Sequence, residues 1–329
     1  RGMDAEHWRR YEMKAKPLSR WLVVTAALAA TIEPQHGTAQ AAAAPVKIPD
    51  VTFVAWNVRN YRLQPVKDRE GNVTTPRKDP ESVKSVVRTL VSLRPDIVGL
   101  SEIGSRQDLA HLQRELKKSG LDLPHRTWVE AVDRERHLAL LSRFPLREVR
   151  HDTKSGFKLG GLPHRVQRGF LDCTAEICPG FALRLLGTHF KSRRIVPEFD
   201  QAEFRRNESL LLRSKVDDIL REDHGSLLLL FGDLNDVKNS PAVRGLAGRR
   251  GDKDSLEILE LADRNGDQWT YHWSESDEYS RVDYVMVSKA LLPLVRKNKS
   301  VVHRAKGWTS ASDHRPLVVK IGLPAKKKP

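Results

Sequence analysis

Several apolar segments of this chain end in side chains that can bind a cation or move a proton. The clearest is LLLLFGDLNDVKNSP, residues 227–241, where an apolar run stops at Gly232 and is followed by Asp233 and Asn235. A short apolar run bounded by turn residues is typical of a strand buried on both faces. If the strand continues, Asp233 and Asn235 point the same way, because they are two residues apart. Taken alone, the pair is better explained as an ordinary Asx turn.

Similar groups stand at the ends of other segments that are predicted to be strands. Carboxylates, carboxamides and imidazoles, with hardly any thiols, are hard oxygen ligands and proton-transfer groups, which suit magnesium rather than zinc. Each residue singly has a structural explanation, such as a loop cap or a partly buried histidine. It is improbable that so many predicted strands carry such side chains at their ends by chance, so we interpret these residues as one site. The segments are VAWN, which ends in Asn57; IVGLSE, in Glu102; LLGTH, in His189; RVDYV, which contains Asp283; and SDH, which contains Asp313 and His314.

Hydrophobic periodicity indicates which elements position these residues. With 329 residues, 39% of them hydrophobic, the chain can bury a large core. We find no fixed-period repeat, no linker, and no apolar segment of about 18 residues that would span a bilayer. Strands that alternate with helices and hairpins predict one mixed α and β domain in which helices cover the sheets. Strands are expected at residues 51–57, 97–100, 128–130, 137–141, 281–287 and 316–321, helices at 80–93, 106–118 and 199–221, and polar loops at 59–77 and 237–268.

The first 44 residues differ from the rest. Lys14, Lys16 and Arg20 precede an apolar stretch at residues 21–32, and Ala-Gln-Ala at 39–41 forms a small-residue cleavage pattern. This order is typical of a secretory signal, whose apolar zone is too short to span a membrane. We therefore expect residues 1–44 to be an upstream extension and signal peptide, and residues 45–329 to form the exported domain. A disordered alanine-rich tail is the alternative.

The two cysteines test the idea of export. Cys173 and Cys178 lie between two runs that both look like strands, and four intervening residues suit a hairpin. Facing residues of a hairpin come close enough for a disulfide. A pair in an exported protein is more often bridged than reduced, so a Cys173–Cys178 disulfide is expected. A metal site is disfavoured because no second Cys or His pair lies at zinc spacing.

The formal net charge of +15 favours a polyanionic partner, such as nucleic acid or an anionic membrane surface. Any single basic cluster is more often a solvated face than a binding site, so the total carries the inference. Lys191, Arg193 and Arg194 directly follow the strand that ends in His189. They are the best candidates for contacts to phosphates beside the reacting one.

The segments WNV, LSE, THFKS, GDLND, RVDYV and SDHRPL, in this order, resemble the motif series of the endonuclease/exonuclease/phosphatase superfamily of metal-dependent phosphoesterases. Each motif is short, but the ordered series is specific, and it covers about residues 51–321. The resemblance implies an α+β fold, a four-layer α/β/β/α sandwich of two packed mixed β-sheets flanked by helices. It also implies hydrolysis of a phosphate ester by in-line attack of water, at a site at one end of the sheets.

Some roles that the resemblance implies concern the metal and the water. Glu102 binds the metal with Asn57 beside it, and Asp313 is a further candidate ligand. Asp233 orients and deprotonates the attacking water, while Asn235 holds that water or a phosphate oxygen. The expected cofactor is Mg²⁺, with Mn²⁺ or Ca²⁺ as alternatives.

The other implied roles concern the phosphate. His314 contacts the scissile phosphate, Asp283 orients its ring, and His189 matches a histidine of the deoxyribonuclease and sphingomyelinase branches that acts near the leaving group. A phosphodiester repels a nucleophile and gains charge as its bond breaks, so the site needs a cation and fixed donors. Hydrogen bonds to the phosphate can be donated by His189, His314, Lys191 and Arg168.

Three functions fit these observations. The first is a secreted or periplasmic magnesium-dependent nuclease that acts on DNA or RNA as a monomer without a protein partner. The second keeps the chemistry but hydrolyses a phospholipid, as sphingomyelinases do, or a small phosphate ester; only the scattered Trp269, Trp273 and Trp308 suggest contact with membrane lipid. The third is a binding protein that lost catalysis, which is disfavoured because no motif is missing. Abasic-site repair is also disfavoured, because THFKS stands where apurinic endonucleases have an asparagine motif.

Overall fold

Two six-stranded sheets face each other in the computed structural model, which describes residues 50–304 and 307–323. The expected signal peptide lies outside the described residues. The first sheet has the order β17 (Val301–Val302), β18 (Leu317–Ile321), β1 (Val51–Tyr61), β4 (Ile97–Ile103), β6 (His137–Ser142) and β5 (His125–Trp128). The second has the order β13 (Glu257–Ile258), β16 (Asp283–Val287), β12 (Leu228–Asp233), β11 (Phe181–His189), β10 (Phe170–Cys178) and β7 (Leu146–Arg147).

Both sheets are mixed, because each contains a parallel pair among antiparallel ones. The parallel pairs are β1 with β4 and β11 with β12. Three small hairpins complete the strands: β2 (Val66–Lys67) with β3 (Val73–Thr75), β8 (Gly156–Leu159) with β9 (Leu162–Arg165), and β14 (Tyr271–Trp273) with β15 (Glu278–Ser280). The short 3₁₀ helices are η1 (Leu292–Leu294), η2 (Lys297–Lys299) and η3 (Trp308–Ser310).

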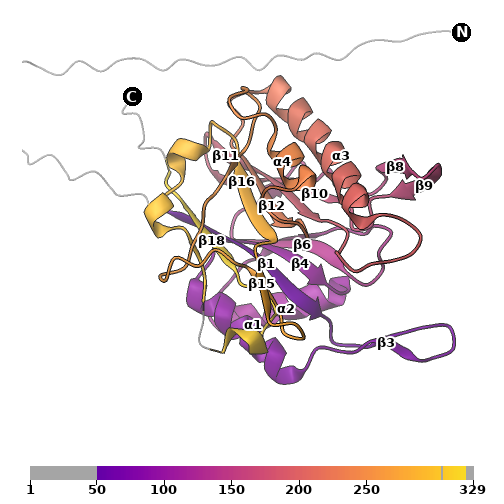
Figure 1. The fold of residues 1–329 in the computed structure, drawn as a ribbon. Helices are drawn as coiled ribbons and strands as arrows, with labels where there is room; N and C mark the ends of the chain where they lie inside the picture. Colours follow the sequence, from indigo (N-terminus) through magenta and orange to yellow (C-terminus); the bar gives the residue numbers. More distant parts are fainter. Residues whose placement is uncertain (1–49, 305–306, 324–329) are drawn as a thin grey trace, which may run out of the picture. The chain divides into compact units, whose positions relative to one another are not determined.

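Helices cover the outer faces of the two sheets (Figure 1). Helices α1 (Pro80–Leu93) and α2 (Arg106–Lys118) pack on the first sheet, and α3 (Gln201–Glu222) and α4 (Pro241–Ala247) pack on the second. A third apolar cluster fills the space between the sheets. The four-layer α/β/β/α sandwich expected from the sequence is therefore confirmed. No helix of the described residues is both long and apolar enough to span a bilayer.

Local signals explain why α1 and α2 begin and end where the sequence predicts. The Asp79 side chain caps α1 by accepting a hydrogen bond from the Ser82 amide (2.9 Å), and Pro80 stands in the first turn. Ser105 and Asp108 form a reciprocal capping box at the start of α2. Helix α1 ends at Arg94, whose φ of +46° is left-handed.

Some details of the predicted elements were wrong. Strand β5 lies at His125–Trp128 rather than at residues 128–130, because its partners on β6 are Ser142 to Ala139. The expected loop 59–77 contains the β2–β3 hairpin, and the loop 237–268 contains α4 and β13. These elements are too short to show a hydrophobic period of their own.

The expected disulfide is absent, and both thiols are free. Cys173 and Cys178 lie on the same strand, β10, and the hairpin turns only afterwards. They are five residues apart, so their side chains point to opposite faces of the sheet. Cys173 is buried between the sheets, where burial raises the pKa of its thiol to about 12, whereas Cys178 is exposed and pairs with Phe181.

Strand alternation brings the functional side chains to the space between the sheets. Leu229 and Phe231 of β12 face that space. Asp233 is two residues beyond Phe231 on the same strand, so its side chain faces the same side. Asn57 likewise follows Phe53 and Ala55 on β1. His189 and Asp283 have the parity of the inward residues of β11 and β16, which are Leu183, Leu185, Val285 and Val287. Four strands thus deliver polar groups to one end of the inter-sheet core.

Candidate functional site

Three of these side chains lie on adjacent strands in matched register. His189 is the parallel partner of Asp233, and Asp233 is the antiparallel partner of Asp283. The space beneath Asp233 is filled by the Phe231 ring, which lies 5.2 Å from the Phe53 ring across the sheets. A Cβ on Gly99 would come within 2.2 Å of the Phe231 ring, so glycine is needed at this position for the sheets to meet. The three groups therefore stand on a rigid, tightly packed base.

Glu102 reaches the site through an irregularity of β4. Its parity matches that of Val98 and Leu100, which face α1 and α2, so a regular strand would point it away. Instead the register shifts between Leu100 and Ile103, and Glu102 has a left-handed φ of +63°. Its carboxylate accepts hydrogen bonds from the Asn57 side chain (3.2 Å) and from the Asn60 amide (2.9 Å).

Asn57 connects the two sheets at this end of the molecule. Its Nδ2 donates to Glu102 Oε1 of the first sheet (3.2 Å) and to Asp233 Oδ2 of the second (3.0 Å). Its Oδ1 accepts from the Arg59 amide (3.0 Å). Asn57 is almost fully buried, so it holds the two carboxylates at a fixed separation.

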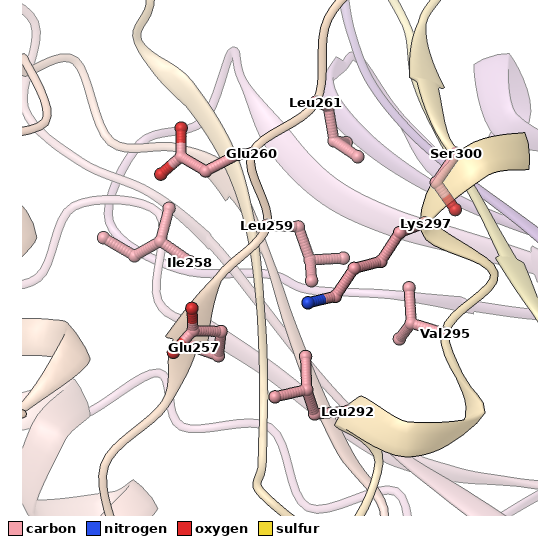
Figure 2. A pocket seen from close by; sticks show the side chains of 9 residues that line it. All are labelled: Glu257, Ile258, Leu259, Glu260, Leu261, Leu292, Val295, Lys297 and Ser300. Atoms are coloured by element: carbon pink, nitrogen blue, oxygen red, sulfur yellow. The ribbon is translucent and has the colours of Figure 1, made fainter. Parts of the chain in front are cut away.

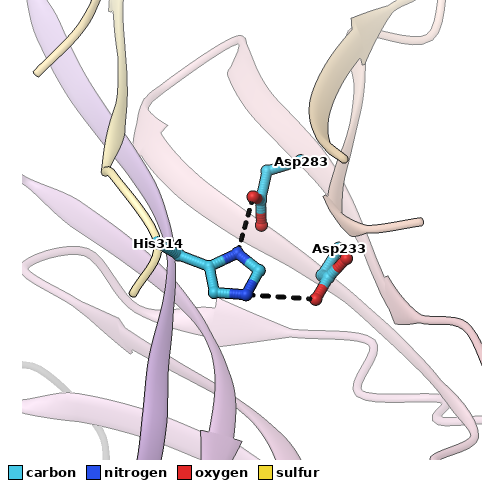
Figure 3. A group of neighbouring side chains, drawn as sticks. All are labelled: Asp233, Asp283 and His314. Carbon is cyan, nitrogen blue, oxygen red and sulfur yellow. Dashed lines mark hydrogen bonds and ion pairs between the residues drawn. The ribbon is translucent and has the colours of Figure 1, made fainter. Parts of the chain in front are cut away.

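His314 lies between two aspartates (Figure 3). Its Nδ1 is 2.8 Å from Asp283 Oδ2, and its Nε2 is 3.8 Å from Asp233 Oδ2. The backbone is fixed on both sides, because the His314 amide donates to Ser312 Oγ and its carbonyl accepts from the Trp56 indole. The Asp283 amide in turn donates to Thr270 Oγ1 (3.0 Å).

Burial and neighbouring charges shift the pKa values of His314 and Asp233. Burial alone would lower the pKa of His314, but the charges of Asp283 and Asp233 outweigh it and raise the pKa to about 10. Burial, together with the charge of Asp283, raises the pKa of Asp233 to about 7. The imidazolium form of His314 is therefore favoured, and Asp233 binds a proton more readily than an exposed aspartate.

His189 is a neutral histidine on the other side of Asp233. Its Nε2 lies 3.5 Å from Asp233 Oδ2 and 4.0 Å from Glu102 Oε1. Burial, and then the charges of Arg168, His314 and Arg136, lower its pKa well below the usual value. Its Nδ1 is buried and has no hydrogen-bond partner among the described residues. The site thus holds one charged and one neutral imidazole.

Asn235 and Asp313, two further predicted site residues, also lie at the site. The Asn235 amide donates to Asp233 Oδ1 (2.9 Å), and its side-chain nitrogen donates to the Phe190 carbonyl (3.0 Å). Asn235 has a left-handed φ of +51°, as the Asx turn requires. Asp313 lies at the rim, with Oδ1 4.0 Å from His314 Nε2 and Oδ2 3.4 Å from Arg59 Nε.

The four basic residues predicted to bind substrate fall into two groups. Arg168 and Lys191 are buried: Arg168 pairs with Asp133 (3.0 Å) and donates to the Phe190 carbonyl, and Lys191 hydrogen-bonds Ser192 Oγ. These contacts hold the chain that follows His189. Arg193 and Arg194 are exposed, and Arg193 reaches Ser280 Oγ of the β14–β15 hairpin (3.1 Å).

Several residues that contact the site were not predicted from the sequence. Arg59 and Asn60 directly follow the WNV motif, which is the one signal that could have revealed them. Arg136, 4.0 Å from Glu102, and Tyr271, whose ring lies 4.8 Å from the His314 ring, belong to no motif. Their roles become visible only when the chain is folded.

The tryptophans that look scattered in the sequence are partly gathered here. The His272 amide donates to the Asp313 carbonyl (3.0 Å), so the β14–β15 hairpin lies against the SDH motif. Behind it, Trp269 packs against Trp308 (5.3 Å between rings) and Tyr279 (4.8 Å). An aromatic cluster therefore borders the site on the side of His314.

The groups at the site fit a hard divalent cation. Carboxylate and carboxamide oxygens are the ligands that Mg²⁺ prefers. Ligand atoms of Asp233, Asp283 and His314 lie within 4.8 Å of one another, but His314 Nδ1 is already bonded to Asp283. Glu102 is better placed to hold the ion. Ligation by Asn57 Oδ1 would require its carboxamide to turn over, because that oxygen accepts from Arg59.

A small cavity beside β13 is unrelated to this chemistry. It lies at the opposite end of β16 from Asp283, beside β13, and holds about 90 Å³. Its lining is largely aliphatic, with Leu259, Leu292 and Val295 around the Lys297 side chain (Figure 2). Glu257 and Glu260 also line it, but no histidine does.

A two-sheet sandwich with carboxylates, carboxamides and histidines at one end suits the hydrolysis of phosphate esters. The model of the Endonuclease/Exonuclease/phosphatase family matches residues 54–314, so the chain belongs to this family. No curated protein sequence matches it.

Solved structures agree on the fold. Truncated TDP2 of Caenorhabditis elegans is 18% identical over 83% of this chain and 98% of its own, with a TM-score of 0.57. The human Nocturnin catalytic domain, with a bound sulfate anion, is 18% identical over 84% of this chain and 95% of its own (TM-score 0.58). The beta toxin of Staphylococcus aureus is 15% identical over 82% of this chain and 99% of its own (TM-score 0.55).

Proposed function

We propose that this protein is an exported, magnesium-dependent phosphodiesterase that hydrolyses nucleic acid. The observation that carries the proposal is the position of Asp233, which lies within 4 Å of Asn57, His189 and His314 in one buried cluster. Such a cluster can bind a phosphate, a water molecule and a cation together. Export is supported by the order of basic, apolar and small residues in the first 44 positions.

Asp233 acts as the general base that orients and deprotonates the attacking water. An efficient base has a pKa near the working pH, and burial raises the pKa of Asp233 to about 7. Asn235 keeps the carboxylate in place through its amide and holds the water or a phosphate oxygen with its side chain.

His314 acts on the phosphate as a fixed cation. Asp283 holds Nδ1, which directs Nε2 toward the space beside Asp233 where the phosphate would bind. Because the cation is preorganised, it stabilises the charge that develops as the ester bond breaks. His189, which is neutral, donates from Nε2 near the leaving group. When bound, Mg²⁺ would supply further charge neutralisation and would acidify the water.

Glu102→Gln tests the assignment of the metal ligand. We expect about a 10–100-fold higher magnesium requirement, because the substitution removes a charge and little volume. Magnesium titration of the hydrolysis rate measures it, and calorimetric magnesium binding provides a second readout. Glu81→Gln is the matched control, because Glu81 is exposed on α1 and paired with Lys84. An unchanged magnesium midpoint would assign the metal to other residues.

Two cations at the rim of the site favour nucleic acid as the substrate. Arg59 is more than half exposed beside Asp313, and Arg193 is exposed beside the β14–β15 hairpin. Together with the net charge of +15, they suit a substrate that carries further phosphates next to the scissile one.

Replacing Arg193 and Arg194 with alanine tests this preference. We expect weaker binding of DNA and a salt slope that is flatter by about 0.7–0.9 for each phosphate that is no longer neutralised. Hydrolysis of bis-p-nitrophenyl phosphate should hardly change, because it has no flanking phosphate. Fluorescence anisotropy with labelled DNA in EDTA, at increasing salt, measures the slope. A salt-independent affinity in the unmodified protein would favour a small-ester substrate instead.

The hairpin beside the site supports a second candidate, a phospholipid hydrolase. Trp273 and Tyr279 are 44% and 52% exposed, which suits contact with a membrane interface. The turn between them is acidic, with Glu275, Asp277 and Glu278, so it would be repelled by an anionic surface. Only a neutral or zwitterionic lipid fits this hairpin. We rank the nuclease first because of the rim cations Arg59 and Arg193 and the net charge of +15.

A further inference from the structure

A separate polar cavity opens next to the site, on the side of α1. It holds about 260 Å³ and is walled by three segments: the end of β1, residues 76–82, and residues 309–312. Two of its walls continue directly into the site, because Arg59 and Asn60 follow Asn57, and Ser312 precedes Asp313. The cavity is therefore continuous with the site.

The cavity has more positive than negative charge. Its lining includes Arg59, Arg77 and Lys78, whereas its one acidic lining residue, Asp79, already caps α1. Lys78 is partly buried, and its Nζ donates to the Arg59 carbonyl (3.0 Å). Burial and the neighbouring Arg59 lower the pKa of Lys78 to about 8, although the carboxylates of Asp313, Glu102 and Asp79 act in the opposite direction. An anion would complete this arrangement.

A larger cavity along α1 adjoins the polar cavity on the side away from the site. It holds about 490 Å³ and shares Arg77 and Lys78 with the first. Farther along, it is lined by Lys84 and Arg88 of α1, by Glu115 of α2, and by Val83 and Val87. Of the two cations, Lys84 is paired with Glu81. Basic groups therefore follow one another along α1, as a polymeric anion would require.

We propose that the cavity around Lys78 binds the nucleotide next to the scissile phosphate, and that the flanking strand then runs along α1. The inference rests on the proposed function and adds a direction and a contact to it. Lys78 pairs with the neighbouring phosphate. A substrate with a single phosphate leaves this cavity unfilled.

Lys78→Met tests the proposal in the full-length protein. We expect about a tenfold higher KM for a single-stranded oligonucleotide and a salt slope for its binding that is lower by about 1. The rate with bis-p-nitrophenyl phosphate should stay within about twofold, because that ester does not reach the cavity. Lys78→Arg should restore most of the oligonucleotide affinity, which a purely structural role would not predict. Lys289→Met, exposed just after β16 at the end away from Asp283, controls for the removal of one positive charge.

The outcomes separate this inference from the proposed function. If the unmodified protein cleaves the oligonucleotide but Lys78→Met leaves its KM and salt slope unchanged, the inference is wrong and the nuclease assignment stands. Equal losses on both substrates would also overturn it, since they would show damage to the site itself. If the unmodified protein does not act on nucleic acid, both proposals fail.

Discussion

Asp233→Asn should lower kcat for a phosphodiester by about 10²–10⁴-fold, the usual contribution of a general base. The substitution keeps the volume and the oxygen that accepts from the Asn235 amide, but it removes the group that takes the proton of water. Binding of the uncleaved substrate should change much less, because Arg59 and His314 remain. Single-turnover kinetics at saturating magnesium would measure the effect on the chemical step.

Asp218→Asn is the matched control for this substitution, because Asp218 is exposed on α3 and paired with Arg221. Circular dichroism should show the same fold for both variants. A near-native rate for Asp233→Asn would mean that Asp233 is a structural turn residue, and another base would have to be identified.

His314→Gln should lower kcat by about 10²–10³-fold, as expected when a preorganised donor to the transition state is removed. Glutamine can still hydrogen-bond Asp283, but it cannot carry the positive charge that the two aspartates stabilise. The loss should appear mainly in kcat, because the developing charge exists only in the transition state.

His272→Gln controls for His314→Gln, since His272 lies on the neighbouring hairpin and pairs with exposed Asp277. It should keep most of the activity. If both variants retain it, the His314–Asp283 pair contributes to the structure rather than to catalysis.

The regular parts of the fold could be predicted because their signals are local. Helices α1 and α2 begin and end as expected, since caps and hydrophobic spacing lie within each segment. The short hairpins and α4 could not, because they depend on contacts with distant segments. The cysteine prediction failed for a related reason: the position of the turn, and not the spacing, decides which residues face each other.

The site was predictable where strand alternation delivers the side chain. Asn57 and Asp233 point inward by simple parity, so identifying the strands was sufficient. Glu102 points inward against its parity, through a left-handed residue and a register shift that no spacing rule reveals. Lys78 lies between the predicted polar loop at 59–77 and helix α1, and no motif marks it. Its relation to the site exists only in three dimensions.

The central claim is that this buried cluster hydrolyses nucleic acid phosphodiesters with the help of a divalent cation. One measurement tests it most directly: the purified protein is incubated with plasmid DNA, RNA, sphingomyelin and bis-p-nitrophenyl phosphate, each with magnesium and with excess EDTA. We expect cleavage of DNA or RNA and of the small diester in magnesium, and none in EDTA. Hydrolysis of sphingomyelin alone, or full nucleic acid cleavage in the chelator, would contradict the account.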